Sequence, residues 1–180
     1  TDRTEAAASL VFDLRLGAWS DDLCRRLDLP RHLLPPVLAP TEAAGEVTPE
    51  AVAATGLAPG TPVAAGAGDN EAALLGCGAA VPGRAAVVLG TSGTVVAPVA
   101  RRRGARALVL GPGLLARGYL VTGVVLSAGR ALEWARDLLF PPGTSLEDLI
   151  RAAGQVAGDP DPPVFLPSLA GERSPVPDPS

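Results

Sequence analysis

Two short apolar segments, each followed by a small polar corner, place the tightest limits on how this chain can fold. The first segment, Thr61–Ala65, leads into the corner Gly66–Asn70, which reads GAGDN. The second, Ala85–Leu89, leads into Gly90–Gly93, which reads GTSG. Apolar runs that stop at glycine-rich corners are typical of strands followed by turns. The sequence therefore predicts two strand ends that present polar groups.

Helices and strands follow one another along the chain. Glu71–Ala80 is rich in Ala and Leu and predicts a helix after the first corner. Thr94–Ala97 completes a hairpin with the second apolar segment, and Ser127 opens a helical pattern that runs to Leu139. The mixture predicts an α/β or α+β class. Helix N-caps are expected at Ser20, Thr48 and Ser145, with Gly56 as a left-handed C-terminal stop.

The charge and hydropathy patterns exclude several classes of function. The chain has 180 residues, a formal net charge of -4 and no lysine. This balance gives no reason to expect nucleic acid or an anionic membrane as a partner. No apolar run reaches the roughly 20 residues that a membrane-spanning helix needs, and no secretory leader opens the chain. We expect a cytoplasmic protein.

Asp69 and Asn70 stand at the first corner, and each has two interpretations. The Asp69 carboxylate is placed to cap the following helix. It also stands at the C-terminal end of a strand, where open sheets bind ligands, and could take a proton from a hydroxyl as a general base. Asn70 can both donate and accept hydrogen bonds, which suits a polyol, or it can be a turn residue.

The tetrapeptide Gly90–Gly93, the GTSG loop, also has two interpretations. Gly and Ser are common hairpin-turn residues, but glycines also let backbone N–H groups converge on phosphate, with the Thr91 and Ser92 hydroxyls as further donors. No Lys follows, so this is not a Walker loop. Gly129 and Glu133 lie one turn apart near a predicted helix start. Gly129 suits either close packing or a backbone approach to phosphate.

In this order, the motifs resemble those of the FGGY carbohydrate kinases, and among them most closely the xylulose kinases. The resemblance covers nearly the whole chain. The Asp-Asn pair and the GERSP segment favour xylulose kinases over glycerol or gluconate kinases. The main matching segments are GTPVAAGAGDN at 60–70, LGTSG at 89–93, LSAGRALEW at 126–134 and FLPSLAGERSP at 165–175.

The resemblance implies the α/β, ribonuclease-H-like (actin-like ATPase) fold and parts of two domains. Residues 1–81 would end the sugar-binding domain, and residues 82–180 would begin the ATP-binding domain. It also implies that Asp69 deprotonates and helps to bind the sugar, which Asn70 contacts. ATP with Mg²⁺ would be the phosphoryl donor. The residues expected to line its phosphates are Gly90, Thr91, Ser92, Gly93 and Gly129, with Glu133 as a further nucleotide candidate and no metal ligand in this chain.

Three parts of the family pattern are not found in the sequence: the N-terminal phosphate and Mg²⁺ hairpin, an early sugar-contacting segment and the C-terminal adenosine segment. We therefore predict an internal segment of a kinase that converts D-xylulose to D-xylulose 5-phosphate, with little activity by itself. The alternatives are a kinase for another acceptor, such as gluconate, ribulose or glycerol, and a non-catalytic fragment that keeps the fold. A homodimer is left open.

Overall fold

The structure is a computed structural model that describes residues 1–101, 108–115, 118–156, 158, 161, 163–174 and 176–178. The chain forms two compact units. Among the described residues, the first unit contains Thr1–Ala86, 96–101 and Val109–Thr122. The second unit contains Val87–Val95 and the chain from Gly123 onward.

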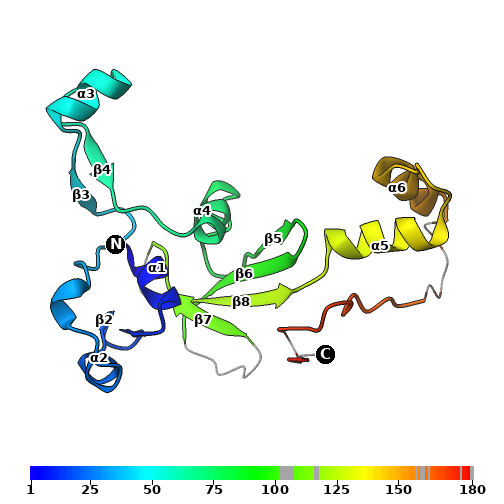
Figure 1. The fold of residues 1–180 in the computed structure, drawn as a ribbon, viewed down its shortest axis with the longest axis horizontal. Coiled ribbons are helices and arrows are strands. Elements are labelled where there is room, and N and C mark those ends of the chain that lie inside the picture. The colour runs from blue at the N-terminus through cyan, green and yellow to red at the C-terminus, as the bar shows by residue number, and fades with distance from the viewer. Residues whose placement is uncertain are drawn as a thin grey trace. The chain divides into compact units, whose positions relative to one another are not determined.

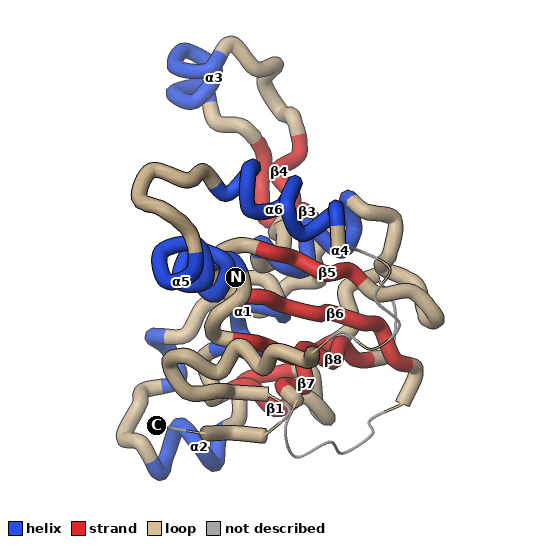
Figure 2. The backbone as a smooth tube through the Cα atoms, turned by 90° about the vertical axis from the view of Figure 1, so that its right-hand side faces the viewer, coloured by secondary structure: helices blue, strands red, loops and turns tan. Residues whose placement is uncertain are grey.

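The elements mix helices with short antiparallel hairpins and one four-stranded sheet, in the order β5-β6-β8-β7 (Figures 1 and 2). In that sheet β7 pairs antiparallel with β8, and α1 packs against β7. The helices are α1 (Arg3–Ala8), α2 (Asp21–Arg26), the 3₁₀ turn η1 (Arg31–Leu33), α3 (Pro49–Thr55), α4 (Asp69–Gly76), α5 (Gly129–Leu139) and α6 (Leu146–Gln155). The strands are β1 (Phe12–Asp13), β2 (Ala18–Trp19), β3 (Ala43–Glu46), β4 (Pro62–Ala64), β5 (Ala86–Leu89), β6 (Gly93–Val99), β7 (Val109–Pro112) and β8 (Tyr119–Val125).

The predicted helix caps are confirmed. The side chains of Ser20, Thr48 and Ser145 each accept a hydrogen bond from a backbone N–H in the first turn of the helix that follows. Gly56 ends α3 in the left-handed conformation, with φ 71°. These starts and stops are local, because a cap bonds to groups two or three residues away. No helix in the described part of the chain is both long and apolar enough to cross a membrane.

Helix α1 was not expected from the sequence. It begins after Asp2, whose carboxylate accepts hydrogen bonds from the backbone N–H groups of Thr4 and Glu5. The spacing of Asp2 and Glu5 is that of a capping box, a signal that could have revealed the helix. Helix α4 also differs from its prediction, because it ends at Gly76 rather than at Ala80.

The core of the first unit is built from small and medium apolar side chains. Leu74, Val96 and Leu120 are fully buried, and three neighbours in the same cluster are nearly so. A second cluster contains Phe12 and Trp19, whose rings meet edge to face with centroids 6.1 Å apart. Buried neighbours of the first cluster are Ala79, Ala86 and Leu114, and those of the second are Ala6 and Val11.

A buried hydrogen bond holds α1 to the first corner, within the first unit. The backbone N–H of Gly68 donates to Thr4 Oγ1 over 2.9 Å, across 64 residues of sequence. Thr4 Oγ1 donates in turn to Asp2 Oδ1 over 2.5 Å. The Gly68 N–H, Thr4 Oγ1 and Asp2 Oδ1 therefore all have partners, which a buried polar group needs in order not to be destabilising.

Thr4→Val is expected to destabilise the chain by about 1–3 kcal/mol, because it leaves the Gly68 N–H and one acceptor site of Asp2 unsatisfied in a buried position. Urea unfolding of the 180-residue chain measures the change. Thr55→Val is the matched control, since Thr55 Oγ1 donates to Ala51 O at an exposed helix end. Equal effects of the two substitutions would contradict the role of the Thr4 hydroxyl.

Candidate active site

The first corner joins β4 to α4 in the first unit. Asp69 is the first residue of α4, and the N-cap position belongs to Gly68, which makes no side-chain cap. The expectation that Asp69 caps this helix is therefore wrong. A carboxylate in the first turn still lies at the positive end of the helix dipole, which favours its ionised form.

Asn70 holds the carboxylate of Asp69. Asp69 Oδ1 accepts two hydrogen bonds from this neighbour, one from the backbone N–H over 2.7 Å and one from the Asn70 Nδ2 group over 3.1 Å. Oδ2 accepts no hydrogen bond from the residues that the structure describes, and Asp69 is exposed. The arrangement fixes one oxygen and leaves the other open to solvent.

Two glutamates, Glu5 of α1 and Glu71 of α4, meet beside this corner, and neither was singled out from the sequence. A methyl group built on Gly68 would lie 2.6 Å from Glu71 Oε2 and 2.7 Å from Glu5 Oε1. Both oxygens therefore reach over the same buried glycine. No local pattern predicts this meeting, because the two glutamates are 66 positions apart.

The half-buried position of Glu71 has an electrostatic cost. Burial is the main cause that raises the pKa of the Glu71 carboxyl. The carboxylates of Glu5, Asp69 and Asp2 raise this pKa further, whereas a hydrogen bond from its own backbone N–H opposes the change. Glu71 thus contributes to the negative field in which Asp69 lies.

The second corner, the GTSG loop, joins β5 to β6 in the second unit, so its interpretation as a hairpin turn is confirmed. The Gly90 N–H donates to Ser92 O over 2.9 Å, which closes the turn. Among the hydrogen bonds of the described residues, none has the backbone N–H of Thr91 or Ser92 as its donor. Both residues are exposed, so two N–H groups and two hydroxyls remain available to an anion.

Gly129 meets the GTSG loop at the start of α5. Its N–H donates to Gly90 O over 2.8 Å, and the Ala128 N–H donates to Thr91 O over 2.9 Å. A methyl group built on Gly129 would lie only 2.6 Å from Gly90 O. Glycine is therefore required for close packing, one of the two roles that its sequence position allowed. Its N–H is used by the loop carbonyl in this structure.

The structure brings some predicted site residues together. In the second unit Gly129 bonds to Gly90, and Thr91 bonds to Ala128, the residue before Gly129. Glu133 is exposed on α5, one turn beyond Gly129. Asp69 and Asn70 belong to the first unit and meet each other there. Within the described ranges, no group of three or more His, Cys, Asp or Glu could hold a metal ion.

An apolar cavity of about 540 Å³ adjoins the GTSG loop in the second unit. Ser127 lines it and is buried, and its hydroxyl has no partner among the described residues. Trp134 and Phe165 stack along its wall with ring centroids 5.8 Å apart. The sequence analysis singled out Ser127 only as a helix start, whereas α5 begins two residues later.

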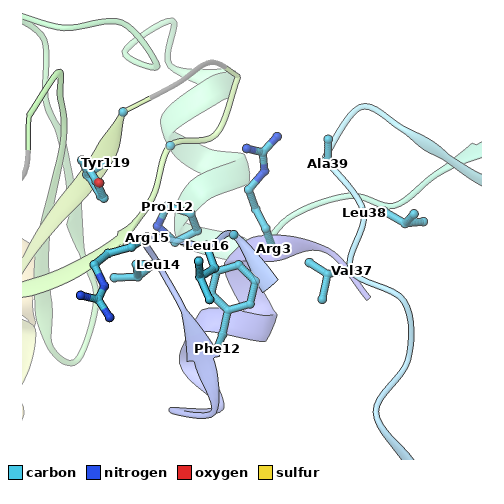
Figure 3. A pocket seen from close by; sticks show the side chains of 13 residues that line it. Arg3, Phe12, Leu14, Arg15, Leu16, Val37, Leu38, Ala39, Pro112 and Tyr119 are labelled. Carbon is cyan, nitrogen blue, oxygen red and sulfur yellow. The ribbon is translucent and has the colours of Figure 1, made fainter. Parts of the chain in front are cut away.

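A second cavity, of about 620 Å³, lies in the first unit (Figure 3). Arg3 and Phe12 line it together with Val37–Ala39 and the β7–β8 turn. Figure 3 shows the guanidinium of Arg3 and that of Arg15 pointing in different directions. No predicted site residue lines this cavity.

Comparison with known proteins shows which fold class the structure has and which protein family the sequence resembles. The structure matches the crystal structure of a xyloylose kinase from Brucella ovis with a TM-score of 0.89 and 34% identity, over 99% of this chain and 37% of that one. The chain therefore has part of the ribonuclease-H-like α/β fold of the sugar kinases. This confirms the predicted fold class.

Residues 1–76 match the model of the N-terminal domain of the FGGY family of carbohydrate kinases. The chain is 34% identical to the xylulose kinase of Escherichia coli (strain K12) over 97% of its length, and 34% identical to the glycerol kinase of Bordetella pertussis over 99%. The chain is thus similar to FGGY carbohydrate kinases over nearly its whole length, which confirms the resemblance. It spans 36% of the length of each of these two relatives.

Gly129→Ala is expected to displace the start of α5 from the GTSG loop, because the added methyl group meets a backbone oxygen that cannot rotate away. We expect destabilisation by about 1–3 kcal/mol, as for other overpacked sites, in urea unfolding of the chain. Gly154→Ala in α6 is the matched control. Nothing lies within 4 Å of its added methyl group, so this helix should gain stability. Similar behaviour of the two variants would argue against the close packing at Gly129.

Glu71→Gln is expected to stabilise the chain near neutral pH. Because the pKa of Glu71 is raised in the folded state, stability falls as pH rises from the unfolded pKa through the folded one. The gain should therefore be present at about pH 7 and vanish at about pH 4, below the unfolded pKa. Urea titrations over this range measure it. Glu46→Gln on exposed β3 is the control, and a pH-independent gain would rule out this electrostatic origin.

Proposed function

We propose that this chain supplies the acceptor base and a phosphate-binding loop of an ATP-dependent sugar kinase that converts D-xylulose to D-xylulose 5-phosphate. The observation that carries the proposal is the carboxylate of Asp69. One of its oxygens is fixed by Asn70, and the other is open at an exposed strand-to-helix corner. A base fixed in this way can accept the proton of a sugar hydroxyl as that oxygen attacks the γ-phosphorus of ATP.

Asn70 has two roles in this proposal. Its side-chain N–H group holds Asp69 Oδ1, which limits rotation of the carboxylate. Its amide oxygen accepts no hydrogen bond from the described residues and can receive one from a sugar hydroxyl. Asn70 would therefore position both the base and the acceptor.

The GTSG loop is proposed to bind the ATP phosphates. The N–H groups of Thr91 and Ser92 and their hydroxyls are the available donors, and Gly90 and Gly93 shape the turn that presents them. Gly129 contributes by fixing the loop, since its N–H already bonds to Gly90 O. Glu133 stays a weaker nucleotide candidate on the same helix. ATP is proposed to bind as its Mg²⁺ complex, in which the metal ion is held by the phosphates.

The choice of D-xylulose rests on the Asp-Asn pair and the GERSP segment, together with the likeness to xylulose kinases. Glycerol is the second candidate, because a glycerol kinase matches the chain with the same 34% identity. The division into a sugar-binding domain at 1–81 and an ATP-binding domain at 82–180 stays part of the proposal, as does a cytoplasmic location.

The proposal is tested by grafting the chain in place of the aligned segment of the E. coli xylulose kinase. We expect the graft to phosphorylate D-xylulose in preference to glycerol, whereas the 180-residue chain alone forms little ADP. Asp69→Asn should lower kcat of the graft by about 10²–10⁴, the usual effect of losing a general base. Coupled measurement of ADP formation gives these rates.

Asp13→Asn is the matched control in the same graft, because among the described residues the Asp13 carboxylate bonds to its own turn, at Arg15 and Leu16. It should leave kcat unchanged. A near-normal rate in the Asp69→Asn graft would show that Asp69 is not the base. If the graft prefers glycerol to D-xylulose, the proposed role of Asp69 as the base would stand, and glycerol would replace D-xylulose as the proposed acceptor.

A further inference from the structure

Glu172 makes a contact in the second unit that the proposed function does not use. Its carboxylate oxygen Oε1 accepts a hydrogen bond from the backbone N–H of Leu126 over 3.3 Å, across 46 residues of sequence. The same oxygen accepts the N–H of its neighbour Arg173 over 2.7 Å. Leu126 is the residue after β8, and Glu172 lies in the C-terminal segment drawn in red in Figure 1.

The backbone of Glu172 is itself fixed. Its N–H donates to Asp178 O over 2.7 Å, and its carbonyl accepts the N–H of Asp178 over 2.8 Å. The side chain is half-buried, so it is partly shielded from water. A carboxylate that is anchored in this way and bonded to two N–H groups holds its partners more strongly than a neutral acceptor would.

Leu126 leads directly to the residues that touch the GTSG loop. Ser127 follows it and is buried, and Ala128 and Gly129 then donate their N–H groups to Thr91 O and Gly90 O. The backbone between Leu126 and Gly129 is therefore held at one end by Glu172 and at the other by the loop. Movement of the first end would shift the second.

We propose that Glu172 is a positioning residue for the GTSG loop: by fixing Leu126, it sets the place of Ala128 and Gly129 and through them the orientation of the Thr91 and Ser92 N–H groups. This inference rests on the proposed function only for its consequence, the binding of phosphate. The positioning itself is a property of the fold. Glu172 does not touch the reacting atoms and is not a catalytic residue.

The experiment follows hydrogen exchange of single backbone amides by NMR in the 180-residue chain. Glu172→Ala and Glu172→Asp both remove the contact, the second by shortening the side chain while keeping its charge. The amides of Leu126, Ala128 and Gly129 should exchange about tenfold faster in both variants, as expected when a hydrogen bond to a charged group is lost. Glu172→Gln keeps an acceptor oxygen and should restore most of the protection.

Two internal references make the result specific. Amides of the first-unit core, such as those of Leu74 and Leu120, should keep their protection in every variant. Glu147→Ala, a change at an exposed glutamate of α6, should affect neither set. If Glu172→Ala fails to fold, the comparison of Glu172→Asp with Glu172→Gln decides the question. Unchanged exchange at Ala128 and Gly129 in Glu172→Asp, or changes confined to Arg173, would overturn the inference.

A titration with MgATP separates this inference from the proposed function. In the wild-type chain we expect the amide signals of Thr91 and Ser92 to shift, and Glu172→Asp should weaken this binding several-fold. Faster exchange without any shift of these signals in the wild type would support the positioning role and contradict the phosphate site. Shifts with equal affinity in wild type and Glu172→Asp would contradict the positioning role and leave the phosphate site standing.

Discussion

The hydrogen bond from the Gly68 N–H to Thr4 Oγ1 is the interaction on which the first unit depends. It joins the start of the chain to the corner that carries Asp69, and it is buried, so no water competes for either group. Because Gly68 is the residue before α4, the bond sets where that helix begins and thus where the Asp69 carboxylate stands. The glutamates beside it, Glu5 and Glu71, place negative charge near the same point. The same contact therefore couples stability to the electrostatic setting of the candidate base.

The second unit depends on a similar close contact, formed between backbone atoms of Gly90 and Gly129. Gly129 lies so close to Gly90 that no other side chain fits, and the two residues are joined by a hydrogen bond. The N–H groups and hydroxyls of the exposed Thr91 and Ser92 take no part in this contact, although Thr91 O accepts the Ala128 N–H. In both corners a glycine makes the structural contact, and its polar neighbours stay available for chemistry. Glycine suits this position because it lets two backbones approach closely.

The sequence was informative where the deciding contact is local and silent where it is distant. The caps at Ser20, Thr48 and Ser145 were predictable, because each side chain bonds to its own helix. The cap assigned to Asp69 was wrong, because the helix start is fixed by Gly68 and its partner 64 residues away. The meeting of Glu5 with Glu71, and that of Glu172 with Leu126, have no periodic signal for the same reason. The family resemblance found the site residues, but not the neighbours that hold them.

The equal identity of the chain to a xylulose kinase and a glycerol kinase bears on where substrate choice resides. The proposed function assigns proton transfer and phosphate binding to groups at the two corners, and both steps are needed whichever polyol is phosphorylated. Under the proposed function, Asp69 and the GTSG loop would serve either acceptor. Asn70 differs from Asp69 and the GTSG loop in its proposed role. Its amide oxygen can contact the acceptor directly, while its side-chain N–H group holds the carboxylate of Asp69. Among the residues singled out at the first corner, it is the one at which acceptor recognition and catalysis would be linked.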